Sequence, residues 1–133
     1  GNSNVIFIND KIPTINQRRF TAAHEIGHIL LGHNIGNISY KNNKFDDTIK
    51  YQELQANTFA RDLLMPSAIL VALNLHYPKD IAEICEISYQ SAMIKAEELK
   101  NIYLNKNNNY SSLDIKLKNQ FKDFINQFRT DNK

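Results

Sequence analysis

The chain has 133 residues, a formal net charge of +2, a hydrophobic fraction of 42% and one cysteine, Cys85. This length suits one compact domain, and no apolar run approaches the roughly 20 residues of a membrane span. A single cysteine excludes an internal disulfide and fits a reducing compartment, and no signal-peptide pattern is visible, so we expect a cytoplasmic protein without a membrane partner. Residues 106–133 carry six Lys/Arg against three Asp/Glu, an excess too small to indicate nucleic-acid binding.

The first third of the chain predicts a strand followed by a helix. "NVIFIND" is an apolar run that predicts one short strand, buried on both faces. Thr14 with Gln17 three residues later matches a capping box, so we expect a helix over residues 15–31 that Gly32 ends. Residues 33–49 are rich in Asn, Gly and Lys and indicate a loop or a hairpin in which "ISY" could form an edge strand.

Helices dominate the prediction for the rest of the chain. We expect one helix over residues 50–65, which Pro66 ends, and shorter helices in "SAILVALNL", "PKDIAEICEIS" and "YQSAMIKAEELKNIYL". A turn near Ile87 and Ser88 should join the last two. Residues 105–112 are an Asn-rich linker. Residues 113–133 then contain a C-terminal amphipathic helix, which we expect to dock on the same domain.

The stretch "RRFTAAHEIGHILLGH" carries the clearest chemical pattern. His24 and His28 lie four residues apart, so on a helix both imidazoles can reach one point. Glu25 is rotated by about 100° from His24; it is badly placed as a ligand but can act as a base on water held at that point. Two histidine ligands and a glutamate base in this spacing are typical of zinc peptidases.

The neighbours of these residues favour a metal over an ordinary surface helix. They are apolar almost all round, which predicts an internal helix. Stranding a polar group inside a protein costs about 2–7 kcal/mol, and one metal ion would satisfy both histidines. Gly27 lowers helix propensity by roughly 1 kcal/mol and indicates the close approach of another backbone.

Two candidates compete for the third ligand position. His33 lies nine residues after His24 and would point to the opposite side of a continuing helix, so it is the weaker candidate. Glu53 belongs to a stripe with Asn57, Ala60 and Leu64 that should face the core, where a carboxylate needs a cation. We therefore predict Glu53 as the third ligand, although pairing of Glu53 with Arg18 or Arg19 stays open.

Asn57 lies one helical turn after Glu53. Its amide can hydrogen-bond a ligand histidine and hold the ring in place. We therefore predict Asn57 as a residue that supports the metal site without binding the ion.

Two blocks of sequence together resemble the ImmA/IrrE family of zinc metallopeptidases. The first is "RFTAAHEIGH" and the second is "ELQANTFARDLLMP", and as a pair they are more specific than HEIGH alone. The resemblance covers roughly residues 5–100. The matching positions are Phe20, Thr21, His24, Glu25, Gly27, His28, Glu53, Ala56, Asn57, Phe59, Ala60, Leu63, Leu64, Met65 and Pro66.

The resemblance implies a zincin-like, gluzincin-type α+β fold over residues 1–104, mostly helical with a small sheet beside the HExxH helix. It implies His24, His28 and Glu53 as Zn²⁺ ligands and Glu25 as the catalytic base. It also implies regulation of transcription in a phage, a mobile element or a stress regulon, by cleavage of a helix-turn-helix repressor. The donor that would stabilise the oxyanion is not identified; candidates by chemistry alone are Tyr51, His76, Tyr77 and Tyr89.

Two other functions compete with the peptidase. The stretch "DIAEICEISYQSAMIKAEEL" has the outline of a helix-turn-helix, but its second helix offers Gln90 and Lys95 beside Glu97 and Glu98, which phosphates repel. We therefore expect a helical hairpin without direct DNA binding. A metal-containing antirepressor that binds its partner without cleaving it is the other alternative, with residues 69–75 and the C-terminal helix as possible partner surfaces.

Overall fold

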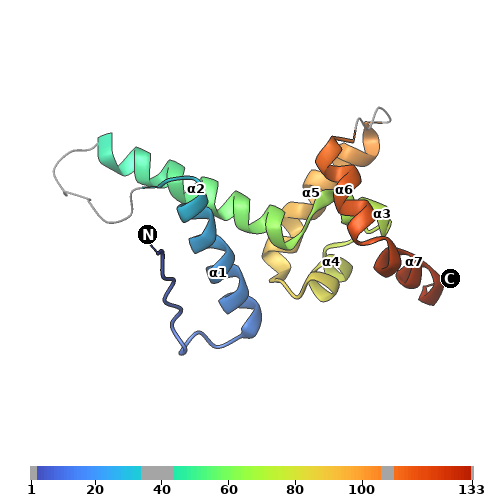
Figure 1. The fold of residues 1–133 in the computed structure, drawn as a ribbon, viewed down its shortest axis with the longest axis horizontal. Coiled ribbons are helices and arrows are strands. Elements are labelled where there is room, and N and C mark those ends of the chain that lie inside the picture. Colours follow the sequence, from blue (N-terminus) through green and yellow to red (C-terminus); the bar gives the residue numbers. More distant parts are fainter. Residues whose placement is uncertain (1–2, 34–43, 106–109, 133) are drawn as a thin grey trace. The chain divides into compact units, whose positions relative to one another are not determined.

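The computed structural model describes residues 3–33, 44–105 and 110–132, and all regular secondary structure in these ranges is helical (Figure 1). No strand occurs in them, so the predicted α+β fold with a small sheet beside the first helix is wrong for this part of the chain. The predicted strand residues are extended without a partner, and one unpaired strand cannot form a sheet. The "ISY" segment lies outside the described residues. None of the described helices combines the length and apolar character that crossing a bilayer requires.

The chain divides into two compact units, Gly1–Leu64 and Met65–Lys133. Unit 1 contains α1 (Ile15–Leu30) and α2 (Lys44–Leu64). Unit 2 contains the remaining described helices, which are α3 (Ser67–Ala72), α4 (Pro78–Cys85), α5 (Tyr89–Leu104), α6 (Ser112–Gln120) and α7 (Lys122–Asp131).

Helix α1 begins at the predicted residue and ends at Leu30, one residue earlier than predicted. The Thr14 side chain accepts a hydrogen bond from the Gln17 backbone N–H at 3.2 Å, which confirms the N-cap. Leu31 closes the helix, and Gly32 follows with φ of +68°, a left-handed conformation that glycine adopts at low cost. The N–H groups of Gly32 and His33 donate to the carbonyls of Ile29 and His28. These two bonds form the Schellman motif that reverses the chain after a helix.

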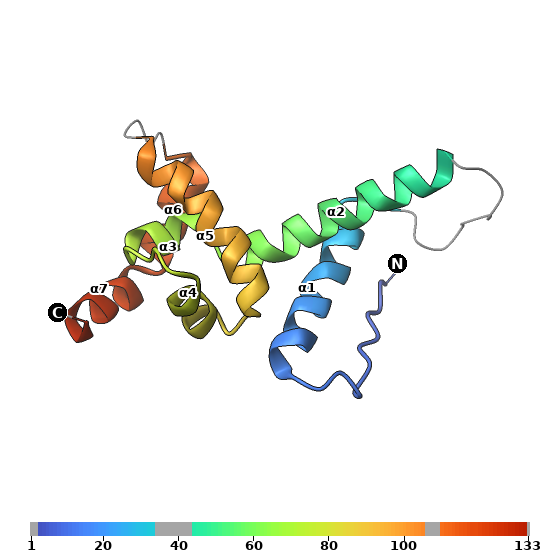
Figure 2. The same ribbon diagram turned by 180° about the vertical axis from the view of Figure 1, so that it is seen from behind.

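Helices α1 and α2 pack against each other and form the core of unit 1 (Figures 1 and 2). Gly27 is buried at this contact, and a Cβ atom placed there would lie 2.9 Å from Cδ1 and 3.2 Å from Cβ of Phe59. The expectation of close approach at Gly27 is correct, but an aromatic side chain of α2 approaches it, not a backbone. Helix α2 starts six residues earlier than predicted, at Lys44 in place of residue 50.

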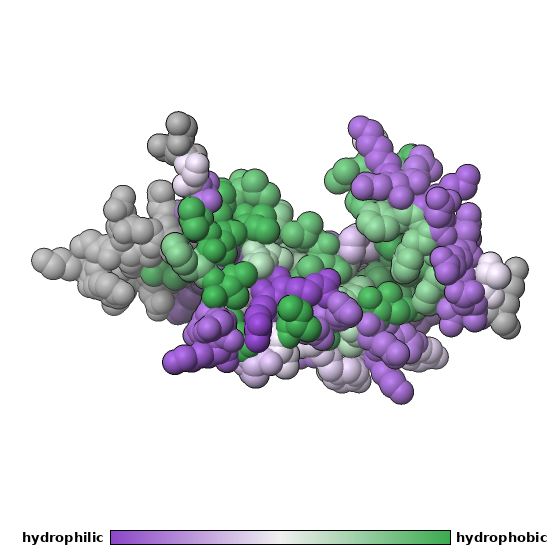
Figure 3. Space-filling view, turned by 60° about the horizontal axis from the view of Figure 1, so that its bottom comes forward, coloured by the Kyte–Doolittle hydropathy of each residue, from purple (hydrophilic) through white to green (hydrophobic). Residues whose placement is uncertain are grey.

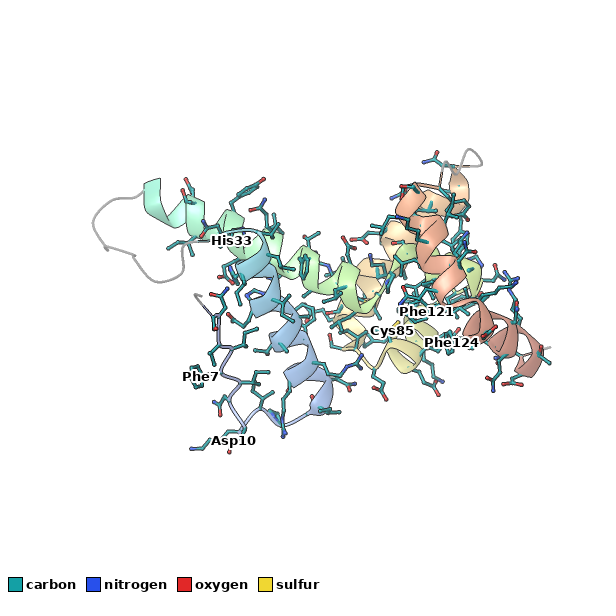
Figure 4. All side chains as sticks on the ribbon, viewed as in Figure 1. Phe7, Asp10, His33, Cys85, Phe121 and Phe124 are labelled. Carbon is teal, nitrogen blue, oxygen red and sulfur yellow. The ribbon has the colours of Figure 1, made fainter. Side chains whose placement is uncertain are left out.

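Helix α1 is less enclosed than its composition predicts. Only Ala23, Gly27 and His28 are buried in it, while Leu30 is 68% exposed. Phe7, in the extended segment that runs beside α1, is 90% exposed (Figure 4). Figure 3 shows in green the hydrophobic residues that reach the surface on one face of the molecule. Within unit 1 the expectation of an internal helix is therefore wrong, because α2 covers one face of α1 and side chains such as Leu30 stay exposed.

Unit 2 is a cluster of short helices. Helix α5 packs against α3 and α4, and α6 packs against α3. The predicted turn at Ile87–Ser88 is confirmed: α4 ends at Cys85, Glu86 adopts a left-handed conformation, and Ser88 caps α5. Most apolar side chains of residues 69–75, a candidate partner surface, are instead buried, namely Ile69, Leu70, Leu73 and Leu75.

The C-terminal segment forms two helices in place of the single one expected. Ser111 and Asp114 form a reciprocal capping box at the start of α6. Phe121 then ends α6 and begins α7. Ile125 of α7 is buried, and the Arg129 guanidinium donates to the Ala72 carbonyl at 2.7 and 3.1 Å. Residues 106–109 of the predicted linker lie outside the described residues.

The Gly27 contact predicts that Gly27→Ala destabilises the protein. The new methyl group overlaps Phe59, which costs about 1–3 kcal/mol, whereas the higher helix propensity of alanine regains about 1 kcal/mol. We expect the free energy of unfolding to fall by up to about 2 kcal/mol, measured by urea unfolding followed by circular dichroism. The same substitution in a Phe59→Ala background is the control and should cost less. A higher urea midpoint for Gly27→Ala alone would contradict the packing.

Candidate metal centre

His24 and His28 lie on one face of α1 with their rings 4.6 Å apart between centroids. The four-residue spacing brings the two Nε2 atoms to 2.9 Å from each other. The His28 side chain is 4% exposed and that of His24 is 15% exposed. The spacing therefore places both imidazoles at one point, as the sequence predicts.

Glu53 reaches the same point from α2. One carboxylate oxygen lies 3.3 Å from His24 Nε2, and the other lies 3.3 Å from His28 Nε2. Glu53 belongs to the stripe of α2 residues that the sequence predicted to face the core. Ala60 of this stripe is fully buried, but the Glu53 side chain is 51% exposed. Glu53 thus lies at the solvent edge of the unit 1 core and leaves the site accessible. Arg18, one of its alternative partners, donates through Nε to the Ile12 carbonyl at 2.9 Å.

Asn57 holds the outer nitrogen of His24. The amide oxygen of Asn57 lies 3.1 Å from His24 Nδ1, and because an amide oxygen can only accept, Nδ1 carries the proton. In a neutral imidazole the other nitrogen is then unprotonated, so His24 Nε2 presents a lone pair to Glu53 and His28. Asn57 and Glu53 are one turn apart on α2, so one helix supplies both the carboxylate and the support.

The three side chains have the chemistry and spacing of a ligand set. His24, His28 and Glu53 could hold a metal ion, since each offers one ligand atom and these atoms lie within 4.8 Å of one another. Donors of a tetrahedral zinc ion at about 2.0–2.1 Å would be about 3.4 Å apart. The separations between the donor atoms, 2.9, 3.3 and 3.3 Å, fall within roughly 0.5 Å of that value. The residues therefore fit a divalent cation.

The electrostatics favour the neutral form of His28 that a metal requires. Burial lowers the pKa of His28 below its ordinary value, and the neighbouring His24 imidazole lowers it further. The charges of Glu53 and Glu25 act in the opposite direction but are outweighed. Glu25 is half-buried on α1 and close enough to influence the pKa of His28, but it is not among the three grouped ligands.

The sequence predicted that His33 would point to the opposite side of a continuing helix, and this prediction is wrong. The Nδ1 atom of His33 lies 2.9 Å from Nδ1 of His28, and its Nε2 lies 3.1 Å from the amide oxygen of Gln55 (Figure 4). The prediction extended the helical rotation past Gly32, where the Schellman motif turns the chain back. His33 therefore contacts the ring of a candidate ligand, but it is not one of the three residues that could hold the ion together. The glycine directly before His33 was the sequence signal for this position; Gln55 had none.

Comparison with known proteins identifies the family. The model of the IrrE N-terminal-like domain, which carries the name Peptidase_M78, matches residues 2–97. No curated protein and no solved structure matches the chain. The matched range contains every predicted site residue, namely His24, Glu25, His28, Glu53 and Asn57. Because the match spans most of the 133 residues, the chain belongs to the IrrE N-terminal-like family of peptidase-type domains, the ImmA/IrrE family.

Proposed function

We propose that this protein is a zinc-dependent endopeptidase that cleaves a helix-turn-helix repressor of a phage, a mobile element or a stress regulon. One observation carries the proposal. Two imidazole nitrogens and a carboxylate from different helices converge within 2.9–3.3 Å of one another. An ion pair between a charged His28 and Glu53 is a simpler alternative, but burial lowers the pKa of His28 and so disfavours its charged form. Membership of a peptidase family supports the same proposal.

The donor set supports zinc as the metal that we propose. Two imidazoles and one carboxylate are the ligands of a common class of catalytic zinc site, which leaves one position open. Bound there, zinc would act as a Lewis acid that polarises a peptide carbonyl and makes water easier to deprotonate. His24, His28 and Glu53 would hold the ion, and Asn57 would keep the His24 ring oriented.

Glu25 is the residue that we assign to proton transfer. Its carboxylate takes a proton from the attacking water as the new carbon–oxygen bond forms at the peptide carbonyl. It then delivers that proton to the amine as the carbon–nitrogen bond breaks, so the base is regenerated. Its place next to His24, rotated by about 100°, would let it act on water at the site without binding the metal.

Buried charge argues against the DNA-binding alternative. Lys95 of α5, one of two side chains suited to a DNA groove, is fully buried. Its ammonium pairs with Glu98 at 2.7 Å and donates to Ser67 at 3.3 Å. A lysine held in this way is not available to phosphates or bases. We therefore propose that the partner of this protein is the repressor and not its operator DNA.

Metal content provides the first test. The purified protein should bind one zinc ion per chain, and Glu53→Gln should lose stoichiometric binding because the amide replaces the only charged ligand. Elemental analysis after dialysis measures this directly. Glu97→Gln in unit 2 is the matched control and should keep the metal. Full zinc occupancy in Glu53→Gln would refute the ligand assignment.

Hydrolysis provides the second test. Glu25→Gln should retain zinc but lower the cleavage rate by about 10²–10⁴-fold, the usual contribution of a general base. The measurement is incubation with the repressor encoded beside the gene, followed by mass spectrometry of the products, again with Glu97→Gln as control. Cleavage by Glu25→Gln at the wild-type rate would remove Glu25 from the mechanism.

The same incubation separates cleavage from binding alone. A peptidase leaves two repressor fragments, and their formation stops when a chelator is added. A repressor that stays intact but releases its operator only in the presence of the metal-loaded protein would instead establish the non-proteolytic antirepressor.

A further inference from the structure

His33 and Gln55 occupy a position that the proposed mechanism does not use. The His33 ring lies edge-on to the His28 ring, with centroids 5.0 Å apart and an interplanar angle of 71°. It joins His28 to α2 through two contacts, Nδ1 to Nδ1 at 2.9 Å and Nε2 to the Gln55 oxygen at 3.1 Å. We infer that His33 is a positioning residue that fixes the tautomer of His28 and so directs the His28 Nε2 lone pair to the metal.

The inference starts at Gln55, because its oxygen can only accept a hydrogen bond. His33 Nε2 must therefore carry a proton and donate it to that oxygen. In the neutral ring, His33 Nδ1 is then unprotonated and accepts. The only hydrogen bond that His28 can form with it is donation from its own Nδ1, which leaves His28 Nε2 without a proton.

The opposite proton order would prevent metal binding. If the amide nitrogen of Gln55 donated to His33, then His33 Nδ1 would carry the proton and donate it to His28 Nδ1. The proton of neutral His28 would then lie on Nε2 and point at His24 and Glu53. Only the order that begins with the Gln55 oxygen gives His28 the lone pair that a ligand needs.

The two ligand histidines are thus oriented by the same helix in two ways. An amide oxygen of Asn57 accepts directly from His24 Nδ1. An amide oxygen of Gln55 acts on His28 through one intervening imidazole. The Schellman motif after α1 makes this possible, because the hydrogen bond from the His33 N–H to the His28 carbonyl at 3.0 Å places the two residues side by side.

Zinc affinity of the full chain tests the role of His33, measured by competition with a chromophoric chelator. His33→Phe keeps the ring but removes the acceptor, so the affinity for Zn²⁺ should fall about 10–100-fold. His33→Asn should recover most of this loss, because its Oδ1 takes the place of Nδ1 and can accept from His28. His76→Phe in unit 2 is the matched control and should bind zinc like the wild type. Equal affinity of His33→Phe and the wild type would overturn the inference.

A second measurement needs no variant and does not depend on how the substitutions fold. Long-range ¹H–¹⁵N spectra of the ¹⁵N-labelled, zinc-loaded wild type report which nitrogen of each imidazole carries a proton. We expect protonated Nε2 and bare Nδ1 in His33, with protonated Nδ1 in His28. A proton on Nδ1 of His33 would overturn the inference.

The inference rests on the metal-binding part of the proposed function and not on hydrolysis. If the wild type binds zinc, shows these tautomers and cleaves nothing, the peptidase proposal fails and the role of His33 stands. If the wild type cleaves its repressor and His33→Phe binds zinc equally well, the role of His33 fails alone. If the wild type binds no zinc, both the peptidase proposal and the role of His33 are refuted.

Discussion

The close contact between Gly27 and Phe59 is the constraint on which the candidate metal centre depends. Both contacts of the Glu53 carboxylate cross the interface between α1 and α2, because the imidazoles belong to one helix and the carboxylate to the other. Since a Cβ at position 27 would lie 2.9 Å from the Phe59 ring, only glycine allows this approach of the two helices. Side chains as short as Glu53 and Asn57 can then reach the histidines.

The polar groups at this interface form two sets with different tasks. The inner set, His24 Nε2, His28 Nε2 and the Glu53 carboxylate, collects acceptors at one point, which is stable only with a cation or a proton between them. The outer set, Asn57 with His33 and Gln55, determines where the imidazole protons lie. Both sets come from α1, α2 and the turn that follows α1, so the packing that brings the candidate ligands together also orients them.

The parts of the structure that sequence predicted well depend on neighbouring residues. The cap at Thr14, the helix end before Gly32 and the turn at Ile87 follow from preferences within a few residues. The pairing of His24 with His28 follows from helical geometry alone. The prediction of a sheet was wrong because a strand needs a partner distant in sequence, and residues 5–8 have none in the described ranges. The prediction that α1 is enclosed on all sides was wrong because apolar composition cannot show which faces of a helix other elements cover.

The sequence by itself determined which residues have the chemistry to bind a metal, because two histidines in one helix and an acidic stripe on another are local patterns. It did not determine where His33 lies, since the rotation rule for helices stops at Gly32. Only the tertiary structure placed α1 against α2, and so brought Gln55 to His33 and Asn57 to His24. Contacts between helices depend on the crossing of two surfaces, and no spacing within a single helix encodes that crossing.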